Sequence, residues 1–324
     1  MTNLDSILKS RDLGRNEYEG PLGGCFDMHD DSDYFGADTW EKAESEMQRR
    51  ALALAMKKSG LGVTDIGALY AGDLLNQCTA SAYGLLEYDV PFFGLYGACS
   101  TSVEGLILAS VYQSARHAEK TAVVVSSHYC SAERQYRSPV EYGAQRSPTA
   151  QWTVTGAGAF IIGSGGKAKI RAALPGIVVE KGISDASNMG AAMAPAAANT
   201  LTRFFAEMGT SPRDYDLIVT GDLGYEGGAI LCDLMLAEGK DIRNNYTDCG
   251  MLIYSKGTQD KHAGGSGCGC AATVTAAYLL PKVESGELGN ILLMATGAMM
   301  SPMSIMQGQA IPAVAHLVNI RTAR

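Results

Sequence analysis

Apolar residues recur along the chain with two different periods, one typical of helices and one typical of strands. Residues 40–58 carry apolar side chains every three or four positions, which predicts a helix. Asp38 or Thr39 precedes this segment as a capping residue, and Gly60 follows its last turn. The first 37 residues show neither period, so we expect them to be irregular.

The other apolar segments predict strands that alternate with helices. In the first part of the chain, strands are expected at 66–71, 90–96, 121–127 and 153–163, with a helix at 101–116. In the second part, helices are expected at 191–208, 226–238 and 267–281, with strands at 215–220 and 289–296. This alternation predicts an α/β fold whose strands are buried and mostly parallel.

Short glycine-rich motifs occur twice in the same order. Gly72-Asp73-Leu74 follows a predicted strand early in the chain, and Gly221-Asp222-Leu223 follows one later. Gly97-Ala98-Cys99-Ser100 and Gly267-Cys268-Gly269-Cys270 each open a predicted helix. A repeat of this length is typical of a duplicated domain.

We therefore expect two similar βαβ halves, 1–165 and 166–324, packed about a pseudo-twofold axis. This packing would bring the two glycine-rich helix starts near one another. The interface between the halves is then a natural cleft for a ligand.

Composition and charge are those of a folded protein without an affinity for nucleic acid. Hydrophobic residues make up 46% of the 324 residues, and the formal net charge is −8 with no concentrated run of Lys and Arg. No apolar run reaches the ~18–20 residues that span a bilayer, and the N-terminus lacks a signal-peptide pattern. We expect a cytosolic chain with eight free thiols, so that any membrane association is peripheral.

Cys99 is the most informative residue, because it lies where a predicted strand runs straight into a helix. Free N–H groups and the helix dipole at such a position favour the thiolate, so we expect the pKa of the Cys99 thiol to be lowered. Glu104, in the next turn, would partly oppose this effect. A small buried residue under a tight turn is the alternative interpretation, and the local pattern does not decide between the two.

The segment 97–102, Gly-Ala-Cys-Ser-Thr-Ser, resembles the nucleophile motif of thiolases and ketoacyl-ACP synthases. In that family the cysteine carries an acyl thioester, and a His together with an Asn or a second His assists it. The stretch 218–223, which matches one of these positions, contains no imidazole, and Ser266 stands where the Asn would be. His262 fits a His-x-x-Gly spacing and is the remaining candidate, with a surface histidine as the alternative.

The resemblance thus implies a thiolase-like fold in which Cys99 is a vestigial nucleophile, with no catalytic residue and no cofactor. Without a base and an oxyanion donor, condensation loses several orders of magnitude in rate, whereas the cleft can still bind a ligand. An active acyltransferase or condensing enzyme that uses Cys99 with His262 is one alternative. A purely structural scaffold for membrane partners is another.

Longer stretches resemble the stage V sporulation protein AD family, from about residue 19 to near the C-terminus. They are 19–23, 71–77, 126–128, 132–137, 141–145, 193–198, 263–268 and 295–298. This resemblance implies a non-enzymatic role in sporulation and germination, with binding of dipicolinic acid or its calcium chelate. It also implies membrane-embedded partners of the same system and a peripheral position at the forespore or spore inner membrane. Enzymes of this fold are commonly dimers, which leaves a homodimer open.

Dipicolinate is a flat pyridine with two carboxylates, so its site needs hydrogen-bond donors and flat walls. The candidate ligand-binding residues are Cys99, Asp73, Asn76, His128, Arg134, Arg137, Asp222, Ser266 and Cys268. The candidate walls are Tyr96, Tyr129 and Tyr136. Asp73 and Asp222 are expected to coordinate Ca²⁺ if it accompanies the ligand, and otherwise to cap turns. His128 either faces the cleft or is a hydrogen-bonded core histidine.

Overall fold

The computed structural model describes residues 4–9, 20–136 and 147–323. Its first long helix, α1 (Trp40–Ser59), begins and ends where the sequence predicts. The Thr39 side chain accepts a hydrogen bond from the Lys42 N–H, and Gly60 ends the helix in the left-handed conformation. The apolar face of α1 packs on the first of two large sheets.

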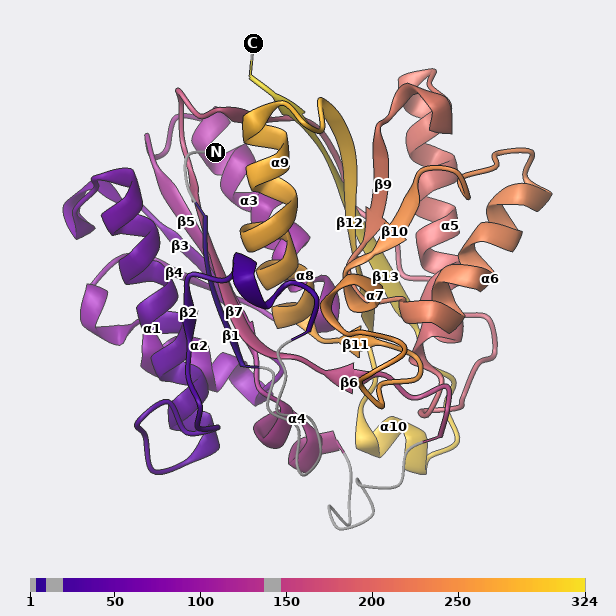
Figure 1. Cartoon of the computed structure of the whole chain (residues 1–324), viewed down its shortest axis with the longest axis horizontal. Coiled ribbons are helices and arrows are strands. Elements are labelled where there is room, and N and C mark those ends of the chain that lie inside the picture. The colour runs from indigo at the N-terminus through magenta and orange to yellow at the C-terminus, as the bar shows by residue number, and fades with distance from the viewer. Residues whose placement is uncertain (1–3, 10–19, 137–146, 324) are drawn as a thin grey trace.

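The first sheet has the strand order β2-β1-β7-β5-β3-β4 (Figure 1). Its strands are β1 (Leu4–Lys9), β2 (Met28–His29), β3 (Leu69–Gly72), β4 (Phe92–Leu95), β5 (Thr121–Ser127) and β7 (Thr155–Ile162). β3 is parallel to β4 and β5, whereas β7 is antiparallel to β5 and β1. The expectation that the first 37 residues are irregular is wrong, because they contain β1 and β2. Pairing with the remote β7, and not a local pattern, forms β1.

The second sheet has the strand order β10-β9-β12-β13-β8. Its strands are β8 (Ala168–Leu174), β9 (Leu217–Thr220), β10 (Tyr246–Asp248), β12 (Asn290–Ala298) and β13 (Ala313–Thr322). β9 is parallel to β10 and β12, whereas β13 is antiparallel to β12 and β8. Two further strands, β6 (Trp152–Thr153) and β11 (Gly265–Ser266), pair in parallel. The chain therefore has the predicted α/β class, with antiparallel strands added to the parallel pairs.

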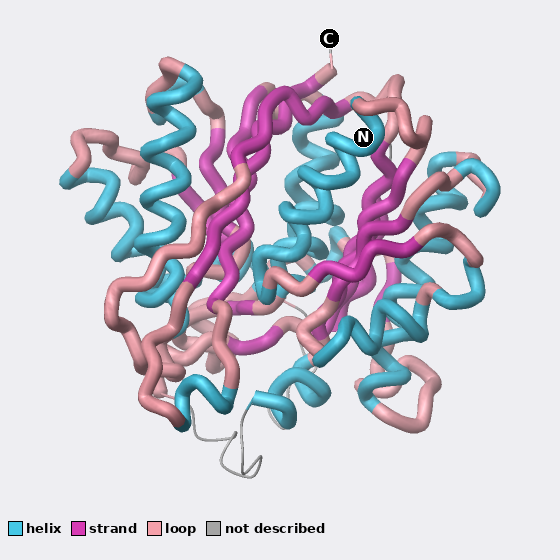
Figure 2. The backbone as a smooth tube through the Cα atoms, turned by 180° about the vertical axis from the view of Figure 1, so that it is seen from behind, coloured by secondary structure: helices cyan, strands magenta, loops and turns pink. Residues whose placement is uncertain are grey.

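The helices lie in three layers that alternate with the two sheets (Figures 1 and 2). Between the sheets lie α3 (Thr101–Ser114), α8 (Cys268–Val274) and α9 (Leu280–Ser285). The outer layers are α1 with α2 (Thr79–Gly84) and α5 (Met189–Met208) with α6 (Gly224–Ala237). Shorter helices are α4 (Tyr129–Tyr136), α7 (Cys249–Ile253) and α10 (Pro302–Met306).

The helix predicted over 267–281 is divided by a π-helical turn, Thr275–Leu279, which joins α8 to α9. Pro281 has no N–H to donate to the preceding turn, so the backbone widens there. Single turns of 3-10 helix occupy Gly23–Cys25, Val63–Asp65, Asn76–Cys78, Leu86–Tyr88, Ala98–Ser100 and Pro212–Asp214.

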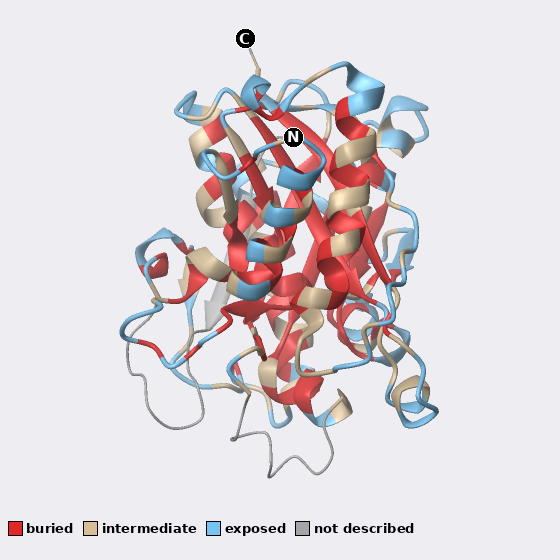
Figure 3. Cartoon of the chain, turned by 90° about the vertical axis from the view of Figure 1, so that its right-hand side faces the viewer, coloured by how far each residue is buried: buried red, intermediate tan, exposed pale blue. Residues whose placement is uncertain are grey.

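The buried side chains form three apolar clusters. One lies around α3 and α8 between the sheets, one under α1, and one under α5 and α6, so that both sheets are covered on both faces (Figure 3). Within the parts of the chain that the structure describes, no helix has the length and apolar composition needed to cross a bilayer.

Candidate functional site

Cys99 lies in the 3-10 turn between the edge strand β4 and the central helix α3. Ala98, just before it, has a left-handed backbone with φ of 51°, which is strained for a residue with a side chain. The second sheet reaches this turn through Gly297, where an added Cβ would lie 2.4 Å from the Gly97 carbonyl oxygen. The absence of a side chain at Gly297 thus lets β12 approach the Cys99 turn.

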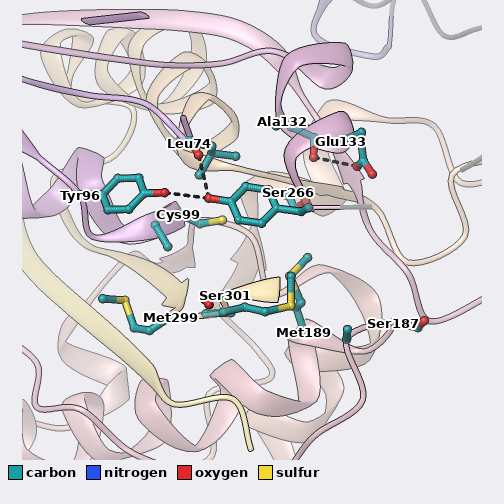
Figure 4. Close-up of a pocket in the computed structure, with 16 residues that line it drawn as sticks. Leu74, Tyr96, Cys99, Ala132, Glu133, Ser187, Met189, Ser266, Met299 and Ser301 are labelled. Atoms are coloured by element: carbon teal, nitrogen blue, oxygen red, sulfur yellow. Dashed lines mark hydrogen bonds between the residues drawn. The ribbon is translucent and has the colours of Figure 1, made fainter. Parts of the chain in front are cut away.

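A cavity of about 390 Å³ opens beside Cys99 (Figure 4), and its lining comes from segments 74–153 and 186–301. It lies within the roughly 300–1,000 Å³ of small-molecule sites. Most of its lining is apolar: Leu74, Tyr96, Ala98, Ala132, Tyr136, Ala186, Met189, Ala298, Met299 and Met300. The polar lining residues are Cys99, Glu133, Thr153, Ser187, Ser266 and Ser301. The cavity therefore offers flat walls, several hydroxyl donors and one carboxylate.

Two tyrosines form one wall of this cavity. The hydroxyl groups of Tyr96 and Tyr136 lie 3.0 Å apart, and the Tyr136 hydroxyl donates to the Leu74 carbonyl oxygen at 2.7 Å (Figure 4). Met189, Met299 and Ser301 lie across the cavity from this pair (Figure 4). Of the three predicted wall tyrosines, Tyr129 lies elsewhere and stacks on Trp152 with the ring centroids 5.6 Å apart.

The Cys99 thiol does not have the lowered pKa that the sequence led us to expect. Burial raises its pKa well above the ordinary value, and the nearby Asp222 carboxyl and Cys268 thiol raise it further. The Gly267 N–H lowers the pKa by a smaller amount. The expectation was based on the helix N-terminus alone, which is outweighed by desolvation and by a neighbouring acid. Cys99 is therefore a neutral thiol at physiological pH.

Asp222 occupies the position after β9 where the sequence comparison finds no imidazole. It is fully buried, accepts hydrogen bonds from Thr296 Oγ1 at 2.8 Å and from the Gly267 N–H at 3.1 Å, and is hydrogen-bonded with Cys99. Burial raises the pKa of Asp222 to about 7. Its carboxyl group lies behind Cys99 and does not line the cavity.

The two candidate histidines provide no base for Cys99. His262 is exposed and lies 2.9 Å from Asp260, and it does not line the cavity. His128 is buried, with Nε2 2.8 Å from the Asp33 carbonyl oxygen and Nδ1 accepting from the Cys130 N–H at 3.2 Å. His262 therefore interacts with its neighbour at the surface, and His128 is hydrogen-bonded in the core.

Asp73 and Asn76, two further candidates, do not line the cavity. Asp73 is fully buried and accepts hydrogen bonds from the Leu75 N–H and from the N–H and hydroxyl of Ser81. Asn76 accepts a hydrogen bond from the Tyr96 hydroxyl at 3.3 Å on the outside of the tyrosine wall. Asp73 thus caps its own turn, which is the alternative that the sequence left open.

Arg134, on α4, faces away from the cavity. Its guanidinium pairs with Glu41 and lies 5.4 Å from the ring centroid of Trp40. Arg137 lies outside the described residues.

In the second half, Ser266 lines the cavity, whereas the thiol of Cys268 is buried and donates to the Ser126 carbonyl oxygen at 3.0 Å. Of the nine candidates, Cys99 and Ser266 thus line the cavity. Reasoning from the sequence missed the segment 299–301, which follows the buried strand β12. The position of this segment beyond the carboxyl end of a parallel strand is the signal that would have identified it.

Comparisons with known proteins agree with this architecture. The solved structure of 3-oxoacyl-[acyl-carrier-protein] synthase III from Aquifex aeolicus VF5 superposes with a TM-score of 0.60, at 14% identity and over 98% of both chains. A solved structure of OleA from Xanthomonas campestris superposes with a TM-score of 0.58, at 14% identity over 86% of this chain and 80% of that chain. These similarities show a thiolase-like fold.

Two comparisons of sequence identify the family more specifically than the fold does. A curated relative, stage V sporulation protein AD of Bacillus subtilis (strain 168), is 41% identical over 304 residues, which are 94% of this chain and 90% of the relative. The family model for stage V sporulation protein AD matches residues 5–321. On this similarity, and with the fold and the cavity described above, the chain belongs to the stage V sporulation protein AD family.

Proposed function

We propose that this protein is a non-enzymatic binding protein for dipicolinic acid or its calcium chelate, acting in dipicolinate uptake during sporulation and in its release during germination. The observation that carries the proposal is the cavity at Cys99, which has aromatic and methionine walls, hydroxyl donors and no histidine among its described lining residues. Membership of a sporulation family supports the biological setting.

The lining suits a flat aromatic acid. Tyr96, Tyr136 and Met189 provide apolar surfaces for a ring, and the hydroxyl groups of Ser266 and Ser301 are donors for carboxylate oxygens. The neutral Cys99 thiol adds a weak donor and no charge. We expect the ligand to lie between the tyrosine wall and the side chains of Met189 and Met299 (Figure 4).

Charge balance is the main constraint on this binding. Glu133 lines the cavity, and among the lining residues that the structure describes there is no Lys or Arg. A bare dianion would be repelled by this carboxylate, so we expect Ca²⁺ to strengthen binding by pairing with both carboxylate groups. Asp73 and Asp222 are engaged in hydrogen bonds away from the cavity, so we do not assign them to the cation.

The same site argues against acyl transfer. A buried neutral thiol with an acid behind it, and no imidazole in the described cavity lining, lacks the activation that a nucleophilic cysteine needs. We propose that the family's membrane-embedded partners recruit this chain to the spore membrane as a peripheral protein. The cavity then serves as the ligand-binding part of that assembly.

The test is calorimetric titration of the full chain with dipicolinate, with and without Ca²⁺. The matched ligand is benzene-1,3-dicarboxylate, which has the same shape without the ring nitrogen. Ser266→Ala and Ser301→Ala should each weaken binding by about tenfold, since each removes a hydrogen bond to a charged group. Ser285→Ala, at an exposed position on α9, is the control that should leave affinity unchanged.

The outcomes separate the candidate functions. Saturable binding that depends on Ser266 and Ser301 supports the proposal. Absence of binding in both buffers would leave a scaffold role. Acylation of Cys99 by an acyl-CoA would instead establish the enzymatic alternative.

A further inference from the structure

A second concave site lies at the opposite end of the molecule from the cavity. It is a pocket of about 710 Å³ lined by Lys169, Arg171, Asp216, Gly286, Gly289, Asn290, Arg321 and Thr322. It lies at the end of β13 near the C-terminus, which is uppermost in Figure 1, whereas α4 and α10 lie at the lower end. Its lining contains three cations and one carboxylate, although the protein as a whole is acidic with a net charge of −8.

The strand pairing brings the three cations to one end of the second sheet. Lys169 and Arg171 both lie on the edge strand β8, and both line the pocket. Arg321 on β13 is the direct register partner of Lys169. The register skips Arg171, which is the extra residue of a bulge opposite Asn319 and Ile320, and such bulges re-aim side chains.

The three cations have few partners within the fold, where Arg321 Nε donates to Asn290 Oδ1 at 3.0 Å. Like charges directly opposite one another on paired strands are destabilising. In the described part of the chain, none of the three cations forms an ion pair, whereas Arg49, Arg50 and Arg243 each lie 2.6 Å from a carboxylate oxygen. The pocket's own carboxylate, Asp216, instead accepts hydrogen bonds from the N–H groups of Gly289 and Asn290.

We infer that this pocket, which we call the β8–β13 pocket, binds a compact dianion through its oxyanion groups. Two guanidinium groups and one ammonium converge on it, and guanidinium binds carboxylate and phosphate oxygens in a bidentate manner. Gly286 and Gly289 carry no side chains that would fill the space. Inorganic phosphate and a free dicarboxylate share this chemistry.

A bilayer surface is a poorer match. Electrostatic attachment to anionic lipids takes clusters of about four to eight cations, and this pocket has three in a chain of net charge −8. The cations also converge into a concavity, which suits a small ligand better than a flat membrane.

The experiment titrates the full chain with inorganic phosphate and, separately, with dipicolinate, at low and moderate salt. The variant Arg171→Gln/Arg321→Gln removes both guanidinium groups. The control Lys57→Gln/Arg116→Gln removes the same charge at exposed positions outside the pocket. Co-sedimentation with phosphatidylglycerol vesicles tests the lipid source, and circular dichroism confirms that each variant is folded.

We expect at least one small dianion to bind, with the Arg171→Gln/Arg321→Gln variant weakening it by about tenfold and the control unchanged. Lys169→Gln alone should give a smaller loss and provides a second test if the double variant does not fold. The proposal would be overturned if the double variant weakened the binding of neither anion, if neither anion bound, or if the chain bound to vesicles only. The inference is independent of the cavity, because phosphate binding here would persist even if dipicolinate does not bind beside Cys99.

Discussion

Glu44 on α1 is a buried acid whose protonation should make the free energy of unfolding depend on pH. It is fully buried, and its two carboxyl oxygens accept hydrogen bonds from Ser126 Oγ at 2.9 Å and Ser131 Oγ at 2.8 Å. Burial, with the nearby Asp73, raises its pKa to about 8. The folded chain therefore favours the neutral acid. The perturbation we choose is Glu44→Gln, which mimics that neutral form.

The sign and size of the pH effect on the free energy of unfolding follow from the difference between the folded and unfolded pKa of Glu44. The folded pKa lies above the unfolded value of about 4.3, so the stabilisation is complete below that value and is lost as pH rises through about 8. Between pH 5.5 and pH 8.5, this single group should lower the free energy of unfolding by about 3 kcal/mol. The Glu44→Gln variant cannot ionise and should lose this part of the pH dependence.

The assay is urea unfolding of both proteins at several pH values between these limits. We expect the wild-type midpoint to fall with pH and the Glu44→Gln midpoint to fall much less. A smaller slope should remain, because burial also raises the pKa of Asp222 to about 7 and that of Asp248 to about 6. Parallel pH profiles for the two proteins would refute the reasoning, since Glu44 would then have the same charge in both states.

Two further predictions concern Cys99 and the edge of the first sheet. Asp222→Asn should speed alkylation of Cys99 by iodoacetamide at pH 8.5, because it removes a carboxyl group that raises the pKa of the thiol, with the exposed Cys25 as internal control. An unchanged rate would mean that burial alone protects the thiol. The edge strand β4 exposes Phe92 and Phe93 at 41% and 44%, so we expect a homodimer through this edge. Light scattering should then show a dimer that Phe93→Lys converts to a monomer, and a monomeric wild type would contradict the prediction.

Local patterns in the sequence predict those elements that their own side chains stabilise. The α1 helix has a cap at Thr39 and a left-handed Gly60, and the strand Thr121–Ser127 matches the apolar run at 121–127. β1 and β8 were not predicted, because their partners in the sheets are remote in sequence. The π-helical turn before Pro281 likewise depends on how two helical segments are joined.

The sequence predicted the residues at the centre of the site, but it did not predict how the side chains around them interact. The strand-to-helix position of Cys99 is readable from residue order, and so is the glycine-rich turn at Ser266. Residue order does not predict the direction in which the pKa of Cys99 shifts, because the shift depends on burial and on Asp222, which is 123 positions away in the chain. The sequence also did not predict that Arg134 pairs with Glu41, since Glu41 comes from a separate helix.

The close approach of Gly297 to the Gly97 carbonyl has a consequence for how the molecule can be divided. Cys99 and the tyrosine wall precede residue 165, whereas Ser266, Met299 and Met300 follow it, so the cavity needs both parts of the chain. A fragment ending near residue 165 would lack Ser266, Met299 and Met300 and so would have no complete cavity. Mixing the two fragments should restore ligand binding only when they reassemble, which makes the cavity a reporter of contact between the halves.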